Sequence, residues 1–145
     1  MKINEHDLHG TSIITLLNDI AKLFNNITKN EVAAHNINVS YANLLFYFSF
    51  YESLTQLDLV KLTHLKAPSI SVTIQKMETD NIIYRKVNPN DMRQFNICLT
   101  DKGKQLSKNI FSILKVQNEK CMQGITEEEM RITKNTLNKI LQNLI

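Results

Sequence analysis

The sequence contains little glycine, proline or cysteine, and it contains no tryptophan. Its 145 residues include 3 Gly, 2 Pro and 2 Cys. Because glycine and proline interrupt helices, their scarcity leaves room for long helices, and a hydrophobic content of 43% argues against a disordered or fibrous chain. Cys98 and Cys121 are too few and too far apart for a disulfide framework or a four-ligand zinc site, so we interpret both as reduced thiols.

Long apolar runs and catalytic signatures are also missing. No run approaches the roughly 20 apolar residues that a membrane-spanning helix needs, and the N-terminal MKINEHDLHG has no apolar leader segment. We therefore expect a cytoplasmic protein with no membrane partner. The sequence has no Gly-rich phosphate loop, nucleophile elbow, His-Glu-x-x-His motif or paired carboxylates in a plausible cleft. It therefore predicts a protein that is not an enzyme and has no cofactor.

The N-terminal residues Glu5, His6, Asp7 and His9 are of the types that bind metal ions. No third ligand at a helical or hairpin spacing completes the two histidines. We interpret the cluster as a polar chain terminus and predict no metal site.

Positive charge is concentrated in the middle of the chain. From Val60 to Lys104 there are eight basic and four acidic residues, so this segment carries a net charge of +4 within a chain whose total is +3. A concentrated positive surface is where a polyanion such as DNA can dock. An ordinary solvated surface is the alternative that charge alone leaves open.

Apolar periodicity predicts helices near both ends of the chain. Residues 11 to 32 place Ile13, Leu16, Leu17, Ile20, Leu23, Phe24 and Ile27 at spacings of three and four, the pattern of an amphipathic helix. A second helix, YANLLFYFSFYES, follows Ser40 as its N-cap and is apolar almost all round, so we expect it to be buried. Toward the C-terminus, Thr100 is the expected cap of a long helix, and Thr126 with Glu129 has the capping-box pattern of a last one.

Residues 55 to 81 predict two short helices joined by a tight turn, which is the helix-turn-helix pattern. Thr55 with Asp58 is a capping pair ahead of the first helix, Pro68 fits the first turn of the second, and Asn81 offers a left-handed stop. The residues expected to face inward are Leu57, Val60, Leu65, Ile70, Ile74 and Met77.

After Asn81 the pattern changes to that of a β-hairpin. IIYRKV and QFNICLT are rich in strand formers, and NPNDMR between them combines turn residues with charge. Residues two apart on an extended segment project to the same side, so we expect the Asp91 carboxylate to hold the guanidinium of Arg93.

The stretch from Leu54 to Leu106 resembles the MarR (multiple antibiotic resistance regulator) family of bacterial winged-helix proteins. LTQLDLVKLTHLKAPSISVTIQKMETDNII is similar to the family's pairing of a short helix with a recognition helix. DMRQFNICLTDKGKQL is close to its wing pattern of Asp-x-Arg, a strand, then Leu-Thr-x-x-Gly. Two positions depart from the family: Asn81 stands where Gly is common, and Val72 stands where many members carry Arg. Valine cannot make the bidentate guanine contact that arginine makes, but it can touch a thymine methyl group.

The resemblance implies a mainly α fold with a small β-hairpin wing, a winged helix-turn-helix flanked by N- and C-terminal dimerisation helices. A single domain is expected over residues 1–145, with dimerisation helices at 11–32 and 104–145 and a DNA-binding lobe at 40–103. The implied function is that of a sequence-specific transcriptional regulator, a ligand-responsive repressor that binds a pseudo-palindromic operator in double-stranded DNA as a homodimer.

The residues expected to contact DNA lie on the exposed face of the second short helix, in the turn before it and on the hairpin. Serine and glutamine suit base edges or phosphates, lysine suits phosphates, and Arg93 is expected to enter the minor groove. An ordinary wet surface is the alternative. The full set is Thr55, His64, Lys66, Pro68, Ser69, Ser71, Val72, Gln75, Lys76, Arg85, Lys86, Asp91 and Arg93.

The resemblance also implies a cleft that could take a small aromatic or amphiphilic effector. Tyr47 and Tyr51 are the candidate residues because a buried tyrosine hydroxyl needs a partner, although an aromatic cluster is commonly plain core. Two other functions stay open. One is a winged-helix module that binds protein. The other is a redox sensor that uses Cys98 or Cys121. A redox sensor needs an exposed thiolate with a low pKa, and the apolar residues around each cysteine in the sequence do not favour one.

Overall fold

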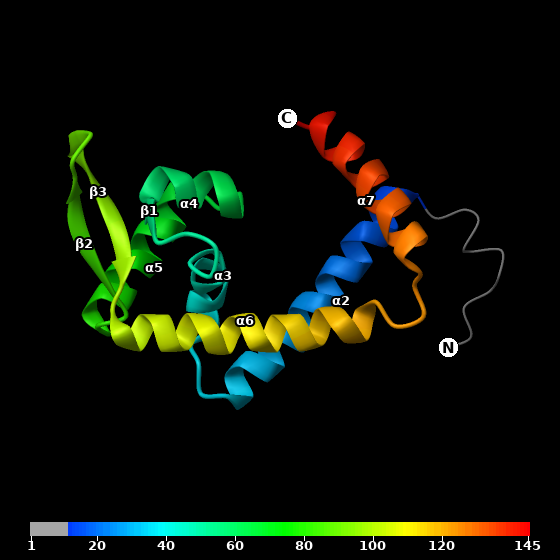
Figure 1. Cartoon of the computed structure of the whole chain (residues 1–145), viewed down its shortest axis with the longest axis horizontal. Helices are drawn as coiled ribbons and strands as arrows, with labels where there is room; N and C mark the ends of the chain where they lie inside the picture. Colours follow the sequence, from blue (N-terminus) through cyan, green and yellow to red (C-terminus); the bar gives the residue numbers. More distant parts are fainter. Residues whose placement is uncertain (1–11) are drawn as a thin grey trace. The chain divides into compact units, whose positions relative to one another are not determined.

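The computed structural model describes residues 12–145 and divides into two compact units, one ending at Leu114 and the other spanning Lys115–Ile145. The elements are α2 (Ile13–Ala34), α3 (Val39–Tyr47), β1 (Ser53–Thr55), α4 (Gln56–Thr63), α5 (Ala67–Thr79), β2 (Ile83–Asn88), β3 (Asp91–Leu99), α6 (Asp101–Cys121) and α7 (Glu127–Gln142) (Figure 1). The predicted mainly α fold with a hairpin wing is confirmed. Within the described residues, no helix combines the length and apolar character that crossing a membrane requires.

Two predictions fall on residues outside the described range. The N-terminal cluster of Glu5, His6, Asp7 and His9 is one, and the start of the first helix at residue 11 is the other. Within the range, Ser12 caps α2 by accepting a hydrogen bond from the Thr15 N–H, and the helix runs two residues beyond the predicted end, to Ala34.

Helices α4 and α5 form the predicted helix-turn-helix. The Thr55 hydroxyl accepts from the Asp58 N–H at 3.1 Å while the Asp58 carboxylate accepts from the Thr55 N–H at 2.9 Å, which is the capping box. His64 closes α4 with φ 56°, and Asn81 follows α5 with φ 57°. Both residues therefore adopt the left-handed conformation that ends a helix. The predicted inward face of α5 is confirmed, because Ile70, Ile74 and Met77 are buried.

Three antiparallel strands form the sheet in the order β1-β3-β2. The β2–β3 hairpin is the predicted wing, with Val87 opposite Phe95 and Asn88 opposite Asp91. Residues 92–94 therefore form a bulge in β3 near the tip. Strand β1 was not predicted, because its three residues are too few to show an alternating pattern.

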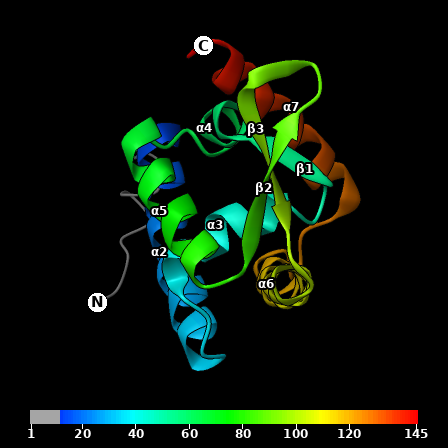
Figure 2. The same ribbon diagram turned by 90° about the vertical axis from the view of Figure 1, so that its left-hand side faces the viewer.

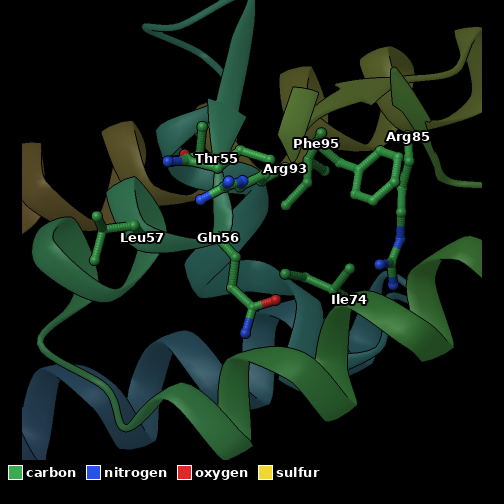
Figure 3. A pocket seen from close by; sticks show the side chains of 9 residues that line it. Thr55, Gln56, Leu57, Ile74, Arg85, Arg93 and Phe95 are labelled. Carbon is green, nitrogen blue, oxygen red and sulfur yellow. The ribbon is translucent and has the colours of Figure 1, made fainter. Parts of the chain in front are cut away.

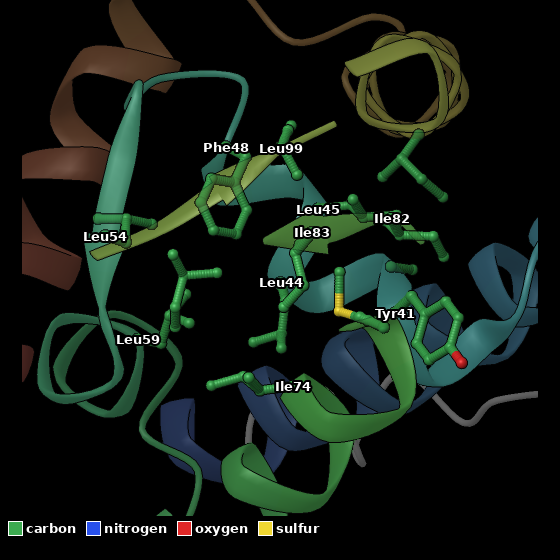
Figure 4. Close-up of a cluster of buried hydrophobic side chains, with 14 of the residues drawn as sticks. Tyr41, Leu44, Leu45, Phe48, Leu54, Leu59, Ile74, Ile82, Ile83 and Leu99 are labelled. Carbon is green, nitrogen blue, oxygen red and sulfur yellow. The ribbon is translucent and has the colours of Figure 1, made fainter. Parts of the chain in front are cut away.

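One hydrophobic core holds the first unit together. Helix α3 lies between α5 and the hairpin (Figure 2), and its Leu44 and Leu45 are among the most deeply buried side chains. Figure 4 shows residues from α3, α4, α5 and all three strands converging on this core. Val32 of α2 and Ile110 of α6 complete it. The core fixes the position of α5 relative to the hairpin. It therefore also fixes how the exposed face of α5 is placed relative to the wing.

The start of α6 is held against the hairpin by a backbone contact. The Thr100 hydroxyl donates to the Asn81 carbonyl oxygen at 2.7 Å and accepts from the Gly103 N–H at 3.1 Å, so Thr100 caps α6 as predicted. A Cβ atom on Gly103 would lie 2.0 Å from the carbonyl oxygen of Ile82. The predicted capping box of α7 at Thr126 and Glu129 is also confirmed.

Several sequence predictions about α3 and α4 are wrong. The N-cap of α3 is Asn38 rather than Ser40, because the Asn38 side chain accepts from the Ser40 N–H. The helix ends at Tyr47, so the last part of the aromatic segment leaves the core and Phe50 is 58% exposed. On α4 the buried residue is Leu59, and Val60 packs against the core in part, as predicted. Leu57 on α4 and Leu65 after its end, which were predicted to face inward, are exposed. The packing of α4 against α3 and the sheet decides which of its side chains are buried. The sequence of so short a helix does not show which face that is.

Candidate nucleic-acid interface

The outer face of α5 lies opposite its buried face and consists mainly of polar side chains. Ser69, Val72, Gln75 and Lys76 are exposed, whereas Ser71 is half-buried. In the turn before the helix, the predicted contacts His64, Lys66 and Pro68 are exposed as well. An exposed helix face of this length, with serine near its start and glutamine and lysine about two turns later, can enter the major groove of DNA and offer hydrogen-bond donors and acceptors there.

A groove of about 300 Å³ runs between the start of α4, α5 and the inner face of the hairpin (Figure 3). We call it the wing groove. Leu57, Ile74, Phe95 and Ile97 supply its apolar lining, and Thr55, Gln56, Arg85, Arg93 and Gln94 supply its polar lining. The groove thus places the Arg93 guanidinium beside the first turn of α4, where the helix dipole is positive, and Arg85 lies farther along the groove, over α5 (Figure 3). The cation and the dipole make the α4 end of the groove attractive to an anion.

The Arg85 side chain extends from β2 of the wing to α5. Its Nε donates to the Glu78 carboxylate at 3.0 Å, which ties β2 to the last part of α5. Lys86 follows Arg85 in an extended strand, so its side chain projects from the opposite face of the hairpin. The structure therefore separates two residues that the sequence placed together: Arg85 lines the wing groove and Lys86 does not.

The predicted hydrogen bond between Asp91 and the guanidinium of Arg93 is wrong. The Asp91 carboxylate instead accepts from the backbone N–H of Arg93 at 3.0 Å and from the side-chain amide of Gln94 at 3.0 Å. The bulge at residues 92–94 explains the difference, because the simple alternation of an extended segment does not hold there. The Arg93 side chain is directed into the wing groove beside Thr55 (Figure 3).

Thr55 has its hydroxyl engaged inside the protein. The hydroxyl donates to the Asp58 carboxylate at 2.7 Å, and this bond, followed by the one from the Thr55 backbone, lowers the pKa of Asp58 below its ordinary value. The ionised carboxylate and its cap keep α4 at the edge of the wing groove.

No protein-family model matches the chain. MepR of S. aureus, solved in complex with DNA, is 26% identical to it with a TM-score of 0.82 over 93% of this chain and 99% of MepR. A MarR-family regulator from Silicibacter pomeroyi is 22% identical, with a TM-score of 0.83 over 100% of this chain and 97% of that one. YwaE, an HTH-type transcriptional regulator of Bacillus subtilis (strain 168), is 21% identical over 99% of this chain and 85% of YwaE.

The chain has the winged-helix fold of the MarR family. In this MarR fold, α4 and α5 are the helix-turn-helix and the β2–β3 hairpin is the wing. The family resemblance noted in the sequence is confirmed at the level of structure, and it extends over nearly the whole chain.

Tyr47 and Tyr51, the candidate effector residues predicted from the sequence, do not share a pocket in this MarR fold. The Tyr47 hydroxyl donates to the Leu62 carbonyl oxygen at 2.7 Å, which ties α3 to α4, and Tyr51 is 46% exposed beyond the end of α3. Neither residue lines the pocket of about 570 Å³ that lies between the segment after α3 and the first half of α6. We call it the aromatic pocket. Its lining residues are Phe48, Ser49, Phe50, Leu99, Lys104, Ser107, Lys108, Phe111 and Ser112.

The aromatic pocket combines packed aromatic rings with lysine side chains. The rings of Phe50 and Phe111 meet edge to face with centroids 5.9 Å apart. Ser107 is buried, and its hydroxyl donates to the Leu45 carbonyl oxygen at 2.8 Å. Lys104 and Lys108 lie one turn apart on α6. No sequence pattern brought the α6 residues of this pocket together with the aromatic cluster, because the two segments are about 60 residues apart in the chain.

Cys98 lies on β3 of the wing, and Cys121 is the last residue of α6. Cys98 is half-buried and Cys121 is exposed. Among the described residues, no three histidine, cysteine or acidic side chains gather as a metal site would require.

Proposed function

We propose that this protein is a DNA-binding transcriptional regulator rather than an enzyme, and that it works in the cytoplasm as a homodimer on a pseudo-palindromic operator. The observation that carries the proposal is the pairing of the exposed outer face of α5 with the wing groove and its two arginines. MepR and a Listeria monocytogenes regulator with the same fold have both been solved with DNA, the second with a 26mer. Their folds support a DNA complex of the same type here.

In the proposed complex, α5 enters the major groove. Ser69, Ser71 and Gln75 meet base edges or phosphates, and Lys76 meets a phosphate. His64, Lys66 and Pro68 lie along the DNA strand next to the helix. The wing supplies the remaining contacts. Arg93 binds the minor groove or the adjacent phosphates. Arg85, which its ion pair with Glu78 fixes over α5, lines the same groove. Lys86 reaches phosphates from the outer face of the wing.

A second copy of the chain is the proposed partner of α2. This helix of 22 residues has only Val32 buried, while Ile13, Leu16, Ile20, Leu23 and Ile27 form a continuous stripe that is between 47% and 64% exposed. An apolar stripe of this length on an isolated chain is typical of a helix that pairs with another. A two-fold axis through such a pair would present two α5 helices to half-sites about 10 base pairs apart.

The test is a titration of the protein with DNA duplexes selected from a random-sequence pool, over a range of salt concentrations. Binding should weaken steeply with salt, because neutralised phosphates release counterions. Arg93→Ala should weaken it by about 1 to 3 kcal/mol and lower the salt slope by about one. Lys22→Ala, which removes one positive charge from α2, is the matched control and should have little effect. A winged-helix module that binds protein instead would select no duplex, and equal effects of the two variants would contradict the role of Arg93.

We also propose that the regulator responds to a small aromatic anion in the aromatic pocket. Three phenylalanine rings suit an aromatic ring, and Lys104 and Lys108 suit a carboxylate at its edge. The ligand would change DNA affinity by favouring one spacing of the two α5 helices, and its effect cannot exceed its differential affinity for the two spacings. The direction of regulation proposed is repression that the ligand relieves.

The probes for this response are benzoate and benzyl alcohol, which share a ring and differ in charge. Benzoate should raise the melting temperature of the protein and weaken its DNA binding more than benzyl alcohol does. Phe111→Ala and Lys108→Ala should lose that difference, whereas Tyr51→Phe, outside the pocket, should keep it. Retention of the full benzoate effect in Phe111→Ala would place the ligand elsewhere.

A further inference from the structure

Val72 occupies the middle of the outer face of α5. Within that helix it is the one large apolar side chain that is exposed, at 51%, among the described residues. Its neighbours one turn away on the same face are Ser69, Gln75 and Lys76, which are all polar. The two methyl groups of Val72 therefore project from the centre of a polar surface.

The protein itself gains little from valine at this position. A β-branched side chain loses rotamer freedom in a helix, so an exposed valine stabilises α5 less than alanine would. The core face is already filled by Ile70, Ile74 and Met77. Single exposed apolar residues are common on proteins, so exposure by itself decides nothing. The informative fact is the position, because Val72 lies at the middle of the exposed face of α5, between polar side chains that can meet base edges.

We propose that Val72 is a specificity-determining residue that contacts the C5 methyl group of a thymine in each half-site. This inference rests on the proposed function. In the major groove, thymine alone among the four bases presents a methyl group. Valine has no hydrogen-bond donor or acceptor, so it selects a base edge by apolar contact, while Ser69 and Gln75 on either side bind polar edges.

The experiment is a double-mutant cycle between the protein and the DNA. A duplex selected from a random-sequence pool by the parent protein is remade with deoxyuridine in place of each thymine in turn, symmetrically in both half-sites. Deoxyuridine removes the methyl group and leaves the Watson–Crick edge unchanged. At one position the parent should lose about fourfold in affinity per half-site, the ratio expected for burial of one methyl-sized group, and about 15-fold for the duplex.

Two variants test whether Val72 causes that loss of affinity. Val72→Ala should bind thymine and deoxyuridine duplexes equally at that position, and it should fold at least as stably as the parent. Ser69→Ala is the matched control on the same face and should keep the full thymine preference, whatever its overall affinity. The inference is overturned if the parent shows no methyl-dependent position or if Val72→Ala retains the preference. Failure to select any duplex would overturn the proposed function itself, so the two failures are distinguishable.

Discussion

Tyr41 is a buried residue of α3 whose hydroxyl binds Asp80, and Asp80 in turn connects three helices. Its hydroxyl donates to the Asp80 carboxylate at 2.6 Å, directly after α5, and the Lys102 ammonium donates to the Asp80 carbonyl oxygen at 2.8 Å. Burial of the ring, together with the hydrogen bond and the negative charge of Asp80, raises the pKa of Tyr41 to about 12. The end of the helix that would read DNA is thereby tied to α3 and α6.

Replacement of this residue, Tyr41→Phe, should destabilise the protein by about 1 to 2 kcal/mol, because it leaves the Asp80 carboxylate without its donor. Since the folded state favours the protonated phenol, its contribution is complete below pH 10 and is lost as the pH rises from 10 towards 12. Urea unfolding at a fixed protein concentration measures both effects. Tyr51→Phe, which removes an exposed hydroxyl, is the control and should change little. A pH-independent difference between Tyr41→Phe and the parent up to pH 11 would contradict this assignment.

At the scale of elements, the close packing of α6 against the hairpin explains the Leu-Thr-x-x-Gly spacing. Leu99 ends β3, Thr100 caps α6, and Gly103 stands one turn later against the Ile82 carbonyl oxygen. Any side chain at Gly103 would meet a backbone atom that cannot rotate away. The motif is therefore a packing requirement that holds the wing to the first turn of α6.

Gly103→Ala should lower the free energy of unfolding by about 2 to 3 kcal/mol, although alanine favours helices, because α6 must move away from the wing. Gly124→Ala is the matched control: Gly124 has φ 79° with open space around it, so alanine there costs only the left-handed backbone strain of about 1 kcal/mol. Thermal and urea unfolding compare the two. Equal stability of Gly103→Ala and the parent would show that the contact relaxes freely.

At the scale of the whole molecule, the exposed stripe of α2 sets the expected assembly. Leu23, at the centre of the stripe, is 64% exposed. Leu23→Asp should yield a monomer at micromolar concentration in light scattering, because a carboxylate cannot enter an apolar interface unpaired. DNA affinity should fall with it, since one lobe binds one half-site without the help of the second.

Asn25→Asp is the control for this variant, because it adds the same charge to the opposite face of α2. It should remain a dimer and bind DNA with nearly parental affinity. A parent protein that is monomeric at micromolar concentration, or a dimeric Leu23→Asp, would contradict the proposed assembly.

The sequence by itself determined the features that depend on neighbouring residues. The two capping boxes, the Pro68 start and the Asn81 stop of α5, and the stripe of Ile70, Ile74 and Met77 all lie where the sequence predicted. Each feature depends on hydrogen bonds or apolar periodicity within a few neighbouring residues, so the local sequence is enough to predict it. The outer face of α5 follows from the same stripe.

Only the tertiary structure decided the contacts between distant segments. Arg85 of β2 pairs with Glu78 of α5, and the aromatic pocket joins the segment after α3 to lysines of α6. Strand β1 forms because its residues pair with β3 in the antiparallel sheet. In each case the free energy comes from a partner remote in sequence, and the residue type alone cannot say which of several partners the folded core will bring within reach.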